Sequence, residues 1–455
     1  MLCNLEKMMK LLLYFLRMLC VTVLSSTLLQ ASEPDIETLL SKLQPEPQEQ
    51  LCRDGVKTDS EYLQCLEEKT KSDPSIDNVN FLAGVYAVKK QYDKAITTYE
   101  INVAKGDKKA TYYLAGIYNE ALKQHDKALP YFEKIKEYED ATCQIGGILA
   151  IVKDESWFGF WNERKAKKRT LNFYDDEIKH GNVKAYGCKG LYYNKFEEYD
   201  KAEKSFLKGV EHGDTQSLFY LGNLYGNFKF DFQKEISYYE KAAEAGNMQA
   251  AHNLGNIYRQ SKEYDKAVHW YSLSAATGDR ESLLGLGQVL RAKGEIGLGN
   301  KVHYALGALG DVRGYTSIGI YYKKNKEYEK AEKVFKACID KGYGDCAAGL
   351  GVMYENNLKD FKQAEQWYLK GYELGSAAST YDLGLFYDET LHDNTKAIEW
   401  YGRAYKMGDA DAAFNLAILY EKELKDKNNA IIWYRKAYDL GDTRAKRKLK
   451  DLGAL

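Results

Sequence analysis

Proline is scarce in this chain, and so is net charge. Only five of the 455 residues are proline, and the formal net charge is −1. Few prolines favour long helices, because proline breaks a helix interior. A balanced charge provides no general attraction to nucleic acid or to anionic membranes, so neither is expected as a partner of the whole chain. No run of 18 apolar residues follows residue 35, so no membrane-spanning helix is expected there.

The signatures of common enzymes and metal sites are missing as well. The sequence contains no GxSxG, HExxH or P-loop motif and no CxxC pair, and its seven histidines are scattered. The carboxylates lie mostly beside lysines, which is typical of solvated helix faces. We therefore expect no catalytic residue, no metal and no cofactor.

Glycine, in contrast, returns at regular intervals, in most places as Gly-Asp or Gly-Asn. From Gly181 to Gly441 the gaps between these glycines are all 32 or 33 residues. A period of this size predicts stacked helical hairpins. Counting in both directions gives eleven units and one further helix at 441–455; the units begin near residues 73, 106, 137, 181, 213, 246, 278, 310, 342, 375 and 408.

The unit that begins at Gly408 shows how each hairpin is built. Leu416, Ala417 and Tyr420 form one apolar face at helical spacing, and Trp433 and Tyr434 form a second face after a polar turn. The small residue lets the two helices approach closely. The closing glycine can end a helix in the left-handed conformation, and the Asp or Asn after it can cap the next helix.

The pattern L-G-x-x-Y…K-A-x-x-W-Y-x-K-A…G-D/N resembles Sel1-like repeats, close relatives of tetratricopeptide repeats, over residues 73–455. The resemblance implies an all-α fold: a right-handed α-solenoid of about eleven Sel1-like or tetratricopeptide-like helix pairs with a C-terminal capping helix. It also implies a protein-binding groove lined by first helices. One unit, 278–309, is degenerate, because Gly294, Gly297 and Gly299 weaken its second helix. We expect a flexible joint or a local change of pitch there.

The ends of the chain lie outside the period. Lys7 and Lys10 precede an apolar stretch that ends at Ala31, which predicts a secretory signal over 1–31, with an uncleaved anchor helix as the alternative. Residues 32–72 are expected to form a helical cap, 73–440 the solenoid, and 441–455 a capping helix. The signal predicts a periplasmic protein, or alternatively a secreted one, and we expect a monomer.

Six cysteines follow the expected signal segment, an even number that favours disulfides in an exported chain. Cys52 and Cys65 flank a turn and are expected to staple the N-terminal cap. Cys143 and Cys188 occupy near-equivalent places in adjacent first helices; they either bridge or remain as two buried thiols. A bridge between Cys338 and Cys346 is implied by the resemblance to cysteine-rich, secreted Sel1-like proteins.

The unit at 137–180 contains an insertion at about 150–169. Its aromatic residues precede a basic run from Arg164 to Arg169; they are Trp157, Phe158, Phe160 and Trp161. Such residues are costly to leave in water. Either they fold back onto the solenoid, or the 157–169 loop contacts a protein partner or a membrane interface.

The tetratricopeptide register predicts which first-helix residues face the groove. The predicted partner-binding residues are Asn223, His252, Asn253, Asn256, Arg259 and Arg291, with Gln288 and Lys323 at matching places. Asparagine can hydrogen-bond an extended peptide, and arginine can meet carboxylates. The alternative is a hydrated polar surface.

These features favour a non-catalytic, periplasmic or secreted scaffold whose partner is a protein. Some periplasmic Sel1-like proteins are immunity proteins, so the resemblance implies a sharper hypothesis: this chain binds and neutralises a type VI secretion effector of the lipase type. One alternative is a secreted factor that binds a host protein. Another is a cell-wall-binding or hydrolytic cysteine-rich Sel1-like protein.

Overall fold

The computed structural model describes residues 36–43, 52, 59–151 and 159–455. Within these ranges every regular element is a helix. The prediction of an all-α repeat fold is therefore confirmed. The expected signal segment at 1–31 lies outside the described residues.

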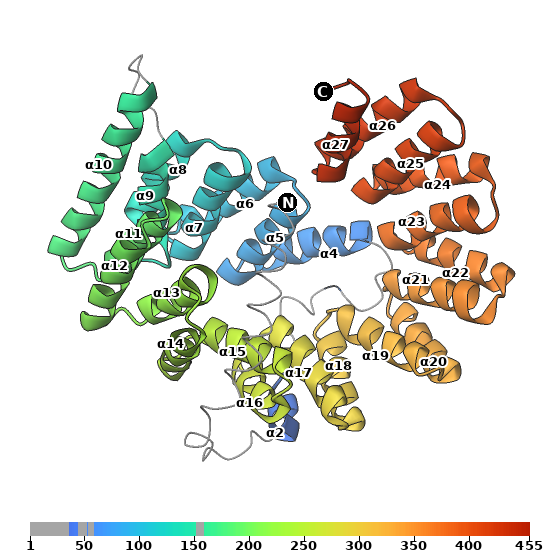
Figure 1. Cartoon of the computed structure of the whole chain (residues 1–455), viewed down its shortest axis with the longest axis horizontal. Helices are drawn as coiled ribbons and strands as arrows, with labels where there is room; N and C mark the ends of the chain where they lie inside the picture. Colours follow the sequence, from blue (N-terminus) through green and yellow to red (C-terminus); the bar gives the residue numbers. More distant parts are fainter. Residues whose placement is uncertain (1–35, 44–51, 53–58, 152–158) are drawn as a thin grey trace, which may run out of the picture. The chain divides into compact units, whose positions relative to one another are not determined.

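The chain divides into two compact units, which are described separately (Figure 1). Unit 1 comprises Met1–Leu51 and Cys65–Gly299, and unit 2 comprises Cys52–Gln64 and Asn300–Leu455. One division falls inside α18 (Ile296–Ala308), in the repeat that the sequence marks as degenerate. Flexibility at this point stays a prediction.

Unit 1 is a stack of antiparallel helix pairs preceded by α2 (Ile36–Lys42) and part of α4 (Asp59–Ser72). The first helices of its pairs are α5 (Ile76–Val88), α7 (Lys108–Gly116), α9 (Ala141–Ile151), α11 (Lys184–Lys195), α13 (Gln216–Leu224), α15 (Met248–Gln260) and α17 (Arg280–Lys293). The second helices are α6 (Tyr92–Val103), α8 (His125–Lys134), α10 (Gly159–Lys179), α12 (Tyr199–Glu211), α14 (Phe232–Glu244) and α16 (Tyr264–Ala275).

Unit 2 continues the same pattern after α18. Its first helices are α19 (Arg313–Lys324), α21 (Asp345–Val352), α23 (Ala377–Leu385) and α25 (Ala410–Lys422). Its second helices are α20 (Tyr328–Ile339), α22 (Phe361–Glu373), α24 (Asn394–Lys406) and α26 (Lys427–Asp439), and α27 (Thr443–Asp451) follows as the capping helix. Figure 1 shows α21 and α23 in one layer, with α22 and α24 in the other.

Small residues set the distance between the two helices of a pair, as the sequence predicts. A Cβ added at Gly255 would overlap the ring of Tyr271, and one added at Gly384 would overlap the ring of Tyr401. Both tyrosines are almost fully buried. The glycine is therefore needed for the close approach of a first helix to the aromatic residue of its partner helix.

The junction between pairs also follows the prediction. Gly246 has a φ of 91°, which ends α14 in the left-handed conformation that glycine adopts without strain. Asn247 then caps α15, because its side-chain oxygen accepts a hydrogen bond from the backbone N–H of Ala250 at 3.0 Å. One Gly-Asn dipeptide thus closes one pair and starts the next.

The difference between 32-residue and 33-residue units has a local cause. Three of the 33-residue units extend their first helix by a π-helical turn: η3 (Tyr225–Lys229), η4 (Met353–Leu358) and η5 (Phe386–Thr390). In the unit at 408, the N–H of Leu424 donates to the carbonyl of Leu419, also five residues back. A π-bulge accommodates one extra residue in a helix, so the longer repeat keeps its partner helix in register.

First helices also contact the first helices of neighbouring pairs. In unit 1, α9 contacts α11, α11 contacts α13, and α15 contacts α17; in unit 2, α19, α21, α23 and α25 contact one another in succession. In the described part of the chain, successive second helices do not pack together to a comparable extent. Within each unit the first helices therefore line the more tightly packed side of the stack.

The N-terminal helices differ in part from the expected cap. In unit 1, the hydroxyl of Tyr86 on α5 donates to Glu67 on α4 at 2.6 Å, so α4 does cover the first hairpin. In contrast, α2 contacts α16, five pairs further along the stack. The helix α2 therefore lies against a later helix pair of unit 1, and the extent of the N-terminal cap stays a prediction.

The insertion also differs from the expected loop, because Gly159–Lys179 form the long helix α10. The basic run lies on this helix. Arg169 donates from Nη2 to the carbonyl oxygen of Leu149 at 2.6 Å, and Lys167 forms an ion pair with Glu198. These two cations therefore bind groups of unit 1, and the predicted 157–169 loop is helical from Gly159 onward. Trp157 and Phe158 lie outside the described residues.

Disulfides join the expected cysteines. Cys143 on α9 bonds Cys188 on α11, with 4.9 Å between their Cα atoms, so two adjacent first helices of unit 1 are linked. Cys338 bonds Cys346 across the junction between α20 and α21 of unit 2. Cys52 and Cys65 are each disulfide-bonded as well; that they bond each other stays a prediction.

Candidate protein-binding surface

The predicted groove residues of unit 1 form a connected hydrogen-bond network on α15 and α17. Asn256 donates from Nδ2 to Nε2 of His252 at 2.8 Å. Its Oδ1 accepts from the hydroxyl of Tyr271 at 2.7 Å and from Nη2 of Arg259 at 3.3 Å. Arg259 also reaches Gln288 at 3.4 Å. Most of the hydrogen-bonding capacity of the Asn256 side chain is therefore used within unit 1 itself.

His252 lies near a serine and an aspartate, but the arrangement differs from a catalytic triad. Its Nδ1 is 2.8 Å from Oγ of Ser282 and 3.5 Å from Asp279, so both groups face the same ring nitrogen. A triad needs the serine and the carboxylate on opposite nitrogens. The Ser282 side chain is also fully buried.

Asp279 has a structural role in the same cluster. It caps α17 by accepting from the backbone N–H of Ser282 at 2.8 Å. The hydrogen bond from His252 and the contacts to Ser282 hold the pKa of this carboxyl well below its usual range. Through these contacts His252 on α15 binds the N-terminus of α17, which links two neighbouring repeats.

The remaining predicted residues of unit 1 are more dispersed. Asn223 accepts from the hydroxyl of Tyr239 at 2.6 Å, which repeats the role of Asn256 one pair earlier. Asn253 is half-buried and lines a pocket of about 500 Å³ together with His252 and Asp279. Arg291 is half-buried in the last turn of α17. Arg164 is exposed on α10, whose first turn contains Phe160 and Trp161.

Unit 2 provides a different acceptor for the hydroxyls of its buried second-helix tyrosines. Here the acceptor is a carboxylate on the first-helix segment, one residue after that segment's own tyrosine. The pairs are Tyr368 to Glu355 at 2.6 Å, Tyr401 to Asp388 at 3.1 Å and Tyr434 to Glu421 at 2.5 Å. Each hydroxyl is donated across a helix pair to a group 13 residues earlier in the chain.

The position that holds the amide beside Tyr239 and Tyr271 is thus available for another side chain in unit 2. The residue after the small residue of the first helix is Asn223, Asn256 or Gln288 in three pairs of unit 1 and Leu191 in a fourth, and it is aliphatic in all four pairs of unit 2. We call the aliphatic set the unit 2 ridge: Ile320, Val352, Leu385 and Ile418. Ile320 is 41% exposed, and the other three are half-buried. Sequence reasoning missed the ridge because it followed polar residues only.

Acidic groups flank the ridge. Burial, reinforced by the carboxylates of Glu355 and Asp409, raises the pKa of Asp382 to about 7. Burial also raises the pKa of Asp388. Lys323, at the start of the row, has its pKa lowered by burial, an effect that Asp382 partly offsets. The first-helix face of unit 2 thus combines apolar groups with carboxylates that resist ionisation.

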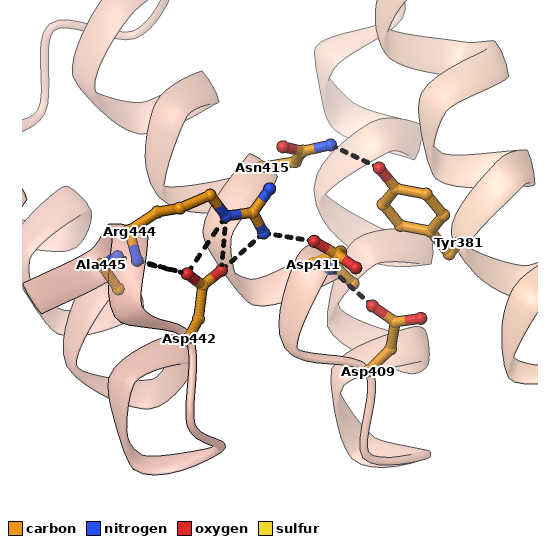
Figure 2. A network of polar contacts seen from close by, with 8 residues as sticks. Tyr381, Asp409, Asp411, Asn415, Asp442, Arg444 and Ala445 are labelled. Carbon is orange, nitrogen blue, oxygen red and sulfur yellow. Dashed lines mark hydrogen bonds and ion pairs between the residues drawn. The ribbon is translucent and has the colours of Figure 1, made fainter. Parts of the chain in front are cut away.

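The C-terminal helix closes unit 2 through polar contacts (Figure 2). Arg444 pairs with Asp442 at 2.6 Å and with Asp411 on α25. Beside them, Asn415 donates to the hydroxyl of Tyr381 at 2.9 Å. Arg444 therefore ties α27 to the last helix pair, as expected of a closing helix.

No helix within the described residues is long and apolar enough to cross a membrane. No group of three His, Cys, Asp or Glu side chains in these ranges is arranged to hold a metal ion.

The repeated helix pairs and their matched first-helix faces define a repeat scaffold of the α-solenoid class. Comparison of the sequence with family models makes the class specific. The Sel1 repeat model matches residues 215–247, 344–376, 377–409 and 410–442, and tetratricopeptide repeat models match 250–281 and 312–340. The chain thus contains Sel1 repeats together with tetratricopeptide-like repeats.

Solved structures of similar fold include c5321, a protective antigen of uropathogenic Escherichia coli. It is 21% identical over 78% of this chain and 82% of that chain, with a TM-score of 0.37. A Sel1 repeat protein from Oxalobacter formigenes is 20% identical over 66% and 95%, with a TM-score of 0.39. Immunity protein Pa5087 from Pseudomonas aeruginosa is 17% identical over 45% and 78%, with a TM-score of 0.28. No curated protein matches the chain.

Proposed function

We propose that the chain is a non-catalytic scaffold that binds a protein partner along the first-helix face of unit 2. The observation that supports this is the unit 2 ridge. Four aliphatic side chains recur at matched positions on successive first helices, and the first of them is 41% exposed. Apolar side chains aligned on a surface are characteristic of protein interaction sites.

The two faces fit a partner differently. In unit 1, Asn256 and Arg259 already bond each other and their neighbours, so a partner would have to compete with internal hydrogen bonds. In unit 2, the ridge side chains have no polar group to satisfy, so covering them releases water without breaking a bond. The partner's segment is therefore apolar where it covers the ridge.

Charge adds a second requirement. Glu355, Asp382 and Asp388 lie on the same first-helix segments as the ridge, and burial by a partner would raise the cost of their charge. A lysine or arginine in the partner would offset that cost. We therefore expect a partner segment in which apolar residues alternate with cations.

The test is crosslinking capture from cells with the full chain as bait. Leu385→Glu combined with Ile320→Glu should abolish recovery of the partner. Ile432→Glu is the matched control, because Ile432 is an equally aliphatic side chain, 48% exposed, on second helix α26. Full recovery by the double variant, with unchanged helicity, would reject the ridge as the site.

For the identity of the partner, we propose an exported effector toxin of the lipase type, which this chain would neutralise in the periplasm. This role rests on the expected signal segment and on the scaffold; the likeness to an immunity protein is too weak to support it. Tight co-purification with a toxin encoded by a neighbouring gene is the expected result. Recovery of a host protein instead would favour a secreted host-interaction factor, and binding to cell-wall fragments would favour the third alternative.

The insertion remains a second candidate contact. Trp157→Ala combined with Trp161→Ala should remove the partner if these aromatic residues anchor it, whereas the ridge variants should then have no effect. The two sets of variants therefore separate the ridge from the insertion.

A further inference from the structure

The second helices of unit 2 repeat an aromatic contact between neighbouring pairs. Tyr372, at the end of α22, meets Trp400 of α24 edge-on, with 5.0 Å between ring centroids. Tyr405, at the end of α24, meets Trp433 of α26 in the same way at 5.3 Å. In both cases the tyrosine lies 28 residues before the tryptophan. The contact is therefore a regular element of the repeat.

A cation completes each of these contacts. Arg403 lies 4.5 Å from the ring centroid of Trp400 and 5.4 Å from that of Tyr372. Lys436 lies 3.6 Å from Trp433 and 5.2 Å from Tyr405. A cation shared by two electron-rich rings is favourable at a partly desolvated site.

The pair before these lacks the tyrosine. Trp367 of α22 has Ile339 of α20 at the same spacing of 28 residues, and within the described ranges no aromatic ring lies against Trp367. A cation is still present, since Lys336 lies 5.6 Å from the ring centroid of Trp367. The site thus keeps the tryptophan and the cation but not the second ring.

A pocket lies where the missing ring would be. Its volume is about 460 Å³, which is within the range of roughly 300–1,000 Å³ found for ligand sites. We call it the Trp367 pocket; its lining is Lys336, Ile339, Asp340, Gln363, Gln366, Trp367 and Lys370. All of these residues belong to α20, α22 or the turn after α20, within unit 2.

The pocket is otherwise well defined. Lys336 forms an ion pair with Glu332 at 2.6 Å and Lys370 with Glu373 at 3.1 Å, so both cations of the lining have a carboxylate on their own helix. Trp367 is half-buried, and its indole N–H has no acceptor in the structure. Ile339 is largely buried. The lining therefore combines an aliphatic and an aromatic side chain with polar and charged groups.

We propose that the Trp367 pocket receives a tyrosine side chain of a protein partner, which takes the place that Tyr372 and Tyr405 occupy in the two following pairs. The phenol ring stands edge-on to Trp367 beside Lys336. The amides of Gln363 and Gln366 lie next to it on α22 and can bond the partner's backbone. This contact lies on the second-helix side, so it extends the proposed function to a second surface of unit 2.

The test uses N-acetyl-tyrosinamide as the probe and N-acetyl-leucinamide as its control, followed by ligand-observed NMR with the full chain. The tyrosine probe should show saturation transfer centred on its ring, and the leucine probe should not. Ile339→Tyr should fill the pocket and weaken probe binding by about fivefold or more, because the probe's edge-on contact is then made internally. Tyr372→Ile should open an equivalent pocket at Trp400 and increase the bound fraction.

The two substitutions act in opposite directions, so a folding defect in one cannot imitate both results. Circular dichroism and Tm are recorded for each variant. The proposal fails if the wild-type chain does not bind the tyrosine probe, or if folded Ile339→Tyr binds it as well as the wild type. Since the probe replaces the partner, either result is independent of whether the unit 2 ridge binds a protein.

Discussion

Units 1 and 2 bury the same tyrosine at the same place in a helix pair but give its hydroxyl different acceptors. In unit 1, Tyr239 and Tyr271 donate to asparagine amides. In unit 2, Tyr368, Tyr401 and Tyr434 donate to carboxylates about one turn further along the first-helix segment. A single hydrogen-bonding requirement is thus met in two ways: by an amide in two pairs of unit 1, and in three pairs of unit 2 by a carboxylate, with an aliphatic residue at the place of the amide.

The comparison also extends to how each unit is cross-linked. The Cys143–Cys188 bond spans 45 residues of unit 1, whereas the Cys338–Cys346 bond spans eight residues of unit 2. A longer closed loop restricts the unfolded chain more strongly. Unit 1 should therefore depend more on its disulfide than unit 2 does.

The largest expected effect comes from removing these bonds. Loop-closure entropy predicts a loss of about 4 kcal/mol for Cys143→Ala with Cys188→Ala, and about 2.5 kcal/mol for Cys338→Ala with Cys346→Ala. Urea unfolding followed by hydrogen exchange can report each unit separately. Equal losses in the two units, or a greater loss in unit 2, would contradict the loop-length explanation.

The next largest effect tests the amide of unit 1. Asn256→Leu leaves the hydroxyl of Tyr271, Nη2 of Arg259 and Nε2 of His252 without their partner, so the free energy of unfolding should fall by about 2–3 kcal/mol. Asn253→Leu is the matched control, since Asn253 is half-buried on the same helix and its side chain takes no part in this network; its change should stay within about 0.5 kcal/mol. Thermal unfolding at pH 8 measures both differences. A similar loss in both variants would mean that burial of leucine, and not the network, sets the cost.

A smaller effect, with a defined pH dependence, is expected in unit 2. The pKa of Asp382 is raised to about 7 from an ordinary value of 3.8, so the folded state holds its proton more tightly than the unfolded state. Stability should therefore be greatest below pH 4 for this group and fall as pH rises to about 7. Asp382→Asn should remove that fall, raising the free energy of unfolding by about 1–2 kcal/mol at pH 8 and changing it little at pH 4. A gain of the same size at both pH values would show that ionisation of Asp382 is not the cause.

The sequence was sufficient to predict the repeat, because most units present a small residue, an aromatic residue or pair and a closing glycine at fixed spacing. Gly246 with Asn247 and Gly255 with Tyr271 behave as those patterns predict. It was not sufficient for the turn inside each pair. Lys262 and Lys359 adopt φ values of 62° and 57°, a left-handed conformation that is unusual for lysine and that no glycine marks in the sequence.

Predicting the candidate site was harder, for a physical reason. Asn256 and Asn223 were predicted as groove residues from their register, yet their main partners are tyrosines 15 and 16 residues later in the chain. A register says which face a residue occupies but not whether its hydrogen bonds are already made. The sequence alone does not show that the buried tyrosine hydroxyls of unit 2 donate to Glu355 and its equivalents. Because of these bonds, no amide is needed at the ridge positions.

The smallest expected effect separates the two functions of Glu355. Its carboxylate accepts from Tyr368 and from Thr390, and its charge helps to raise the pKa of Asp382. Glu355→Gln keeps a side-chain oxygen as acceptor but removes the charge, so the change in stability at pH 5 should be below about 1 kcal/mol. The pKa of Asp382, measured by carbonyl NMR, should fall below about 7, and the loss of stability between pH 4 and pH 7 should become shallower. Glu355→Leu, which removes acceptor and charge together, should give the same fall in pKa with a clear loss of stability. If Glu355→Gln destabilises unit 2 as much as Glu355→Leu does, the hydroxyl of Tyr368 requires a charged acceptor. An amide, which serves as the acceptor in unit 1, could then not replace the carboxylate in unit 2.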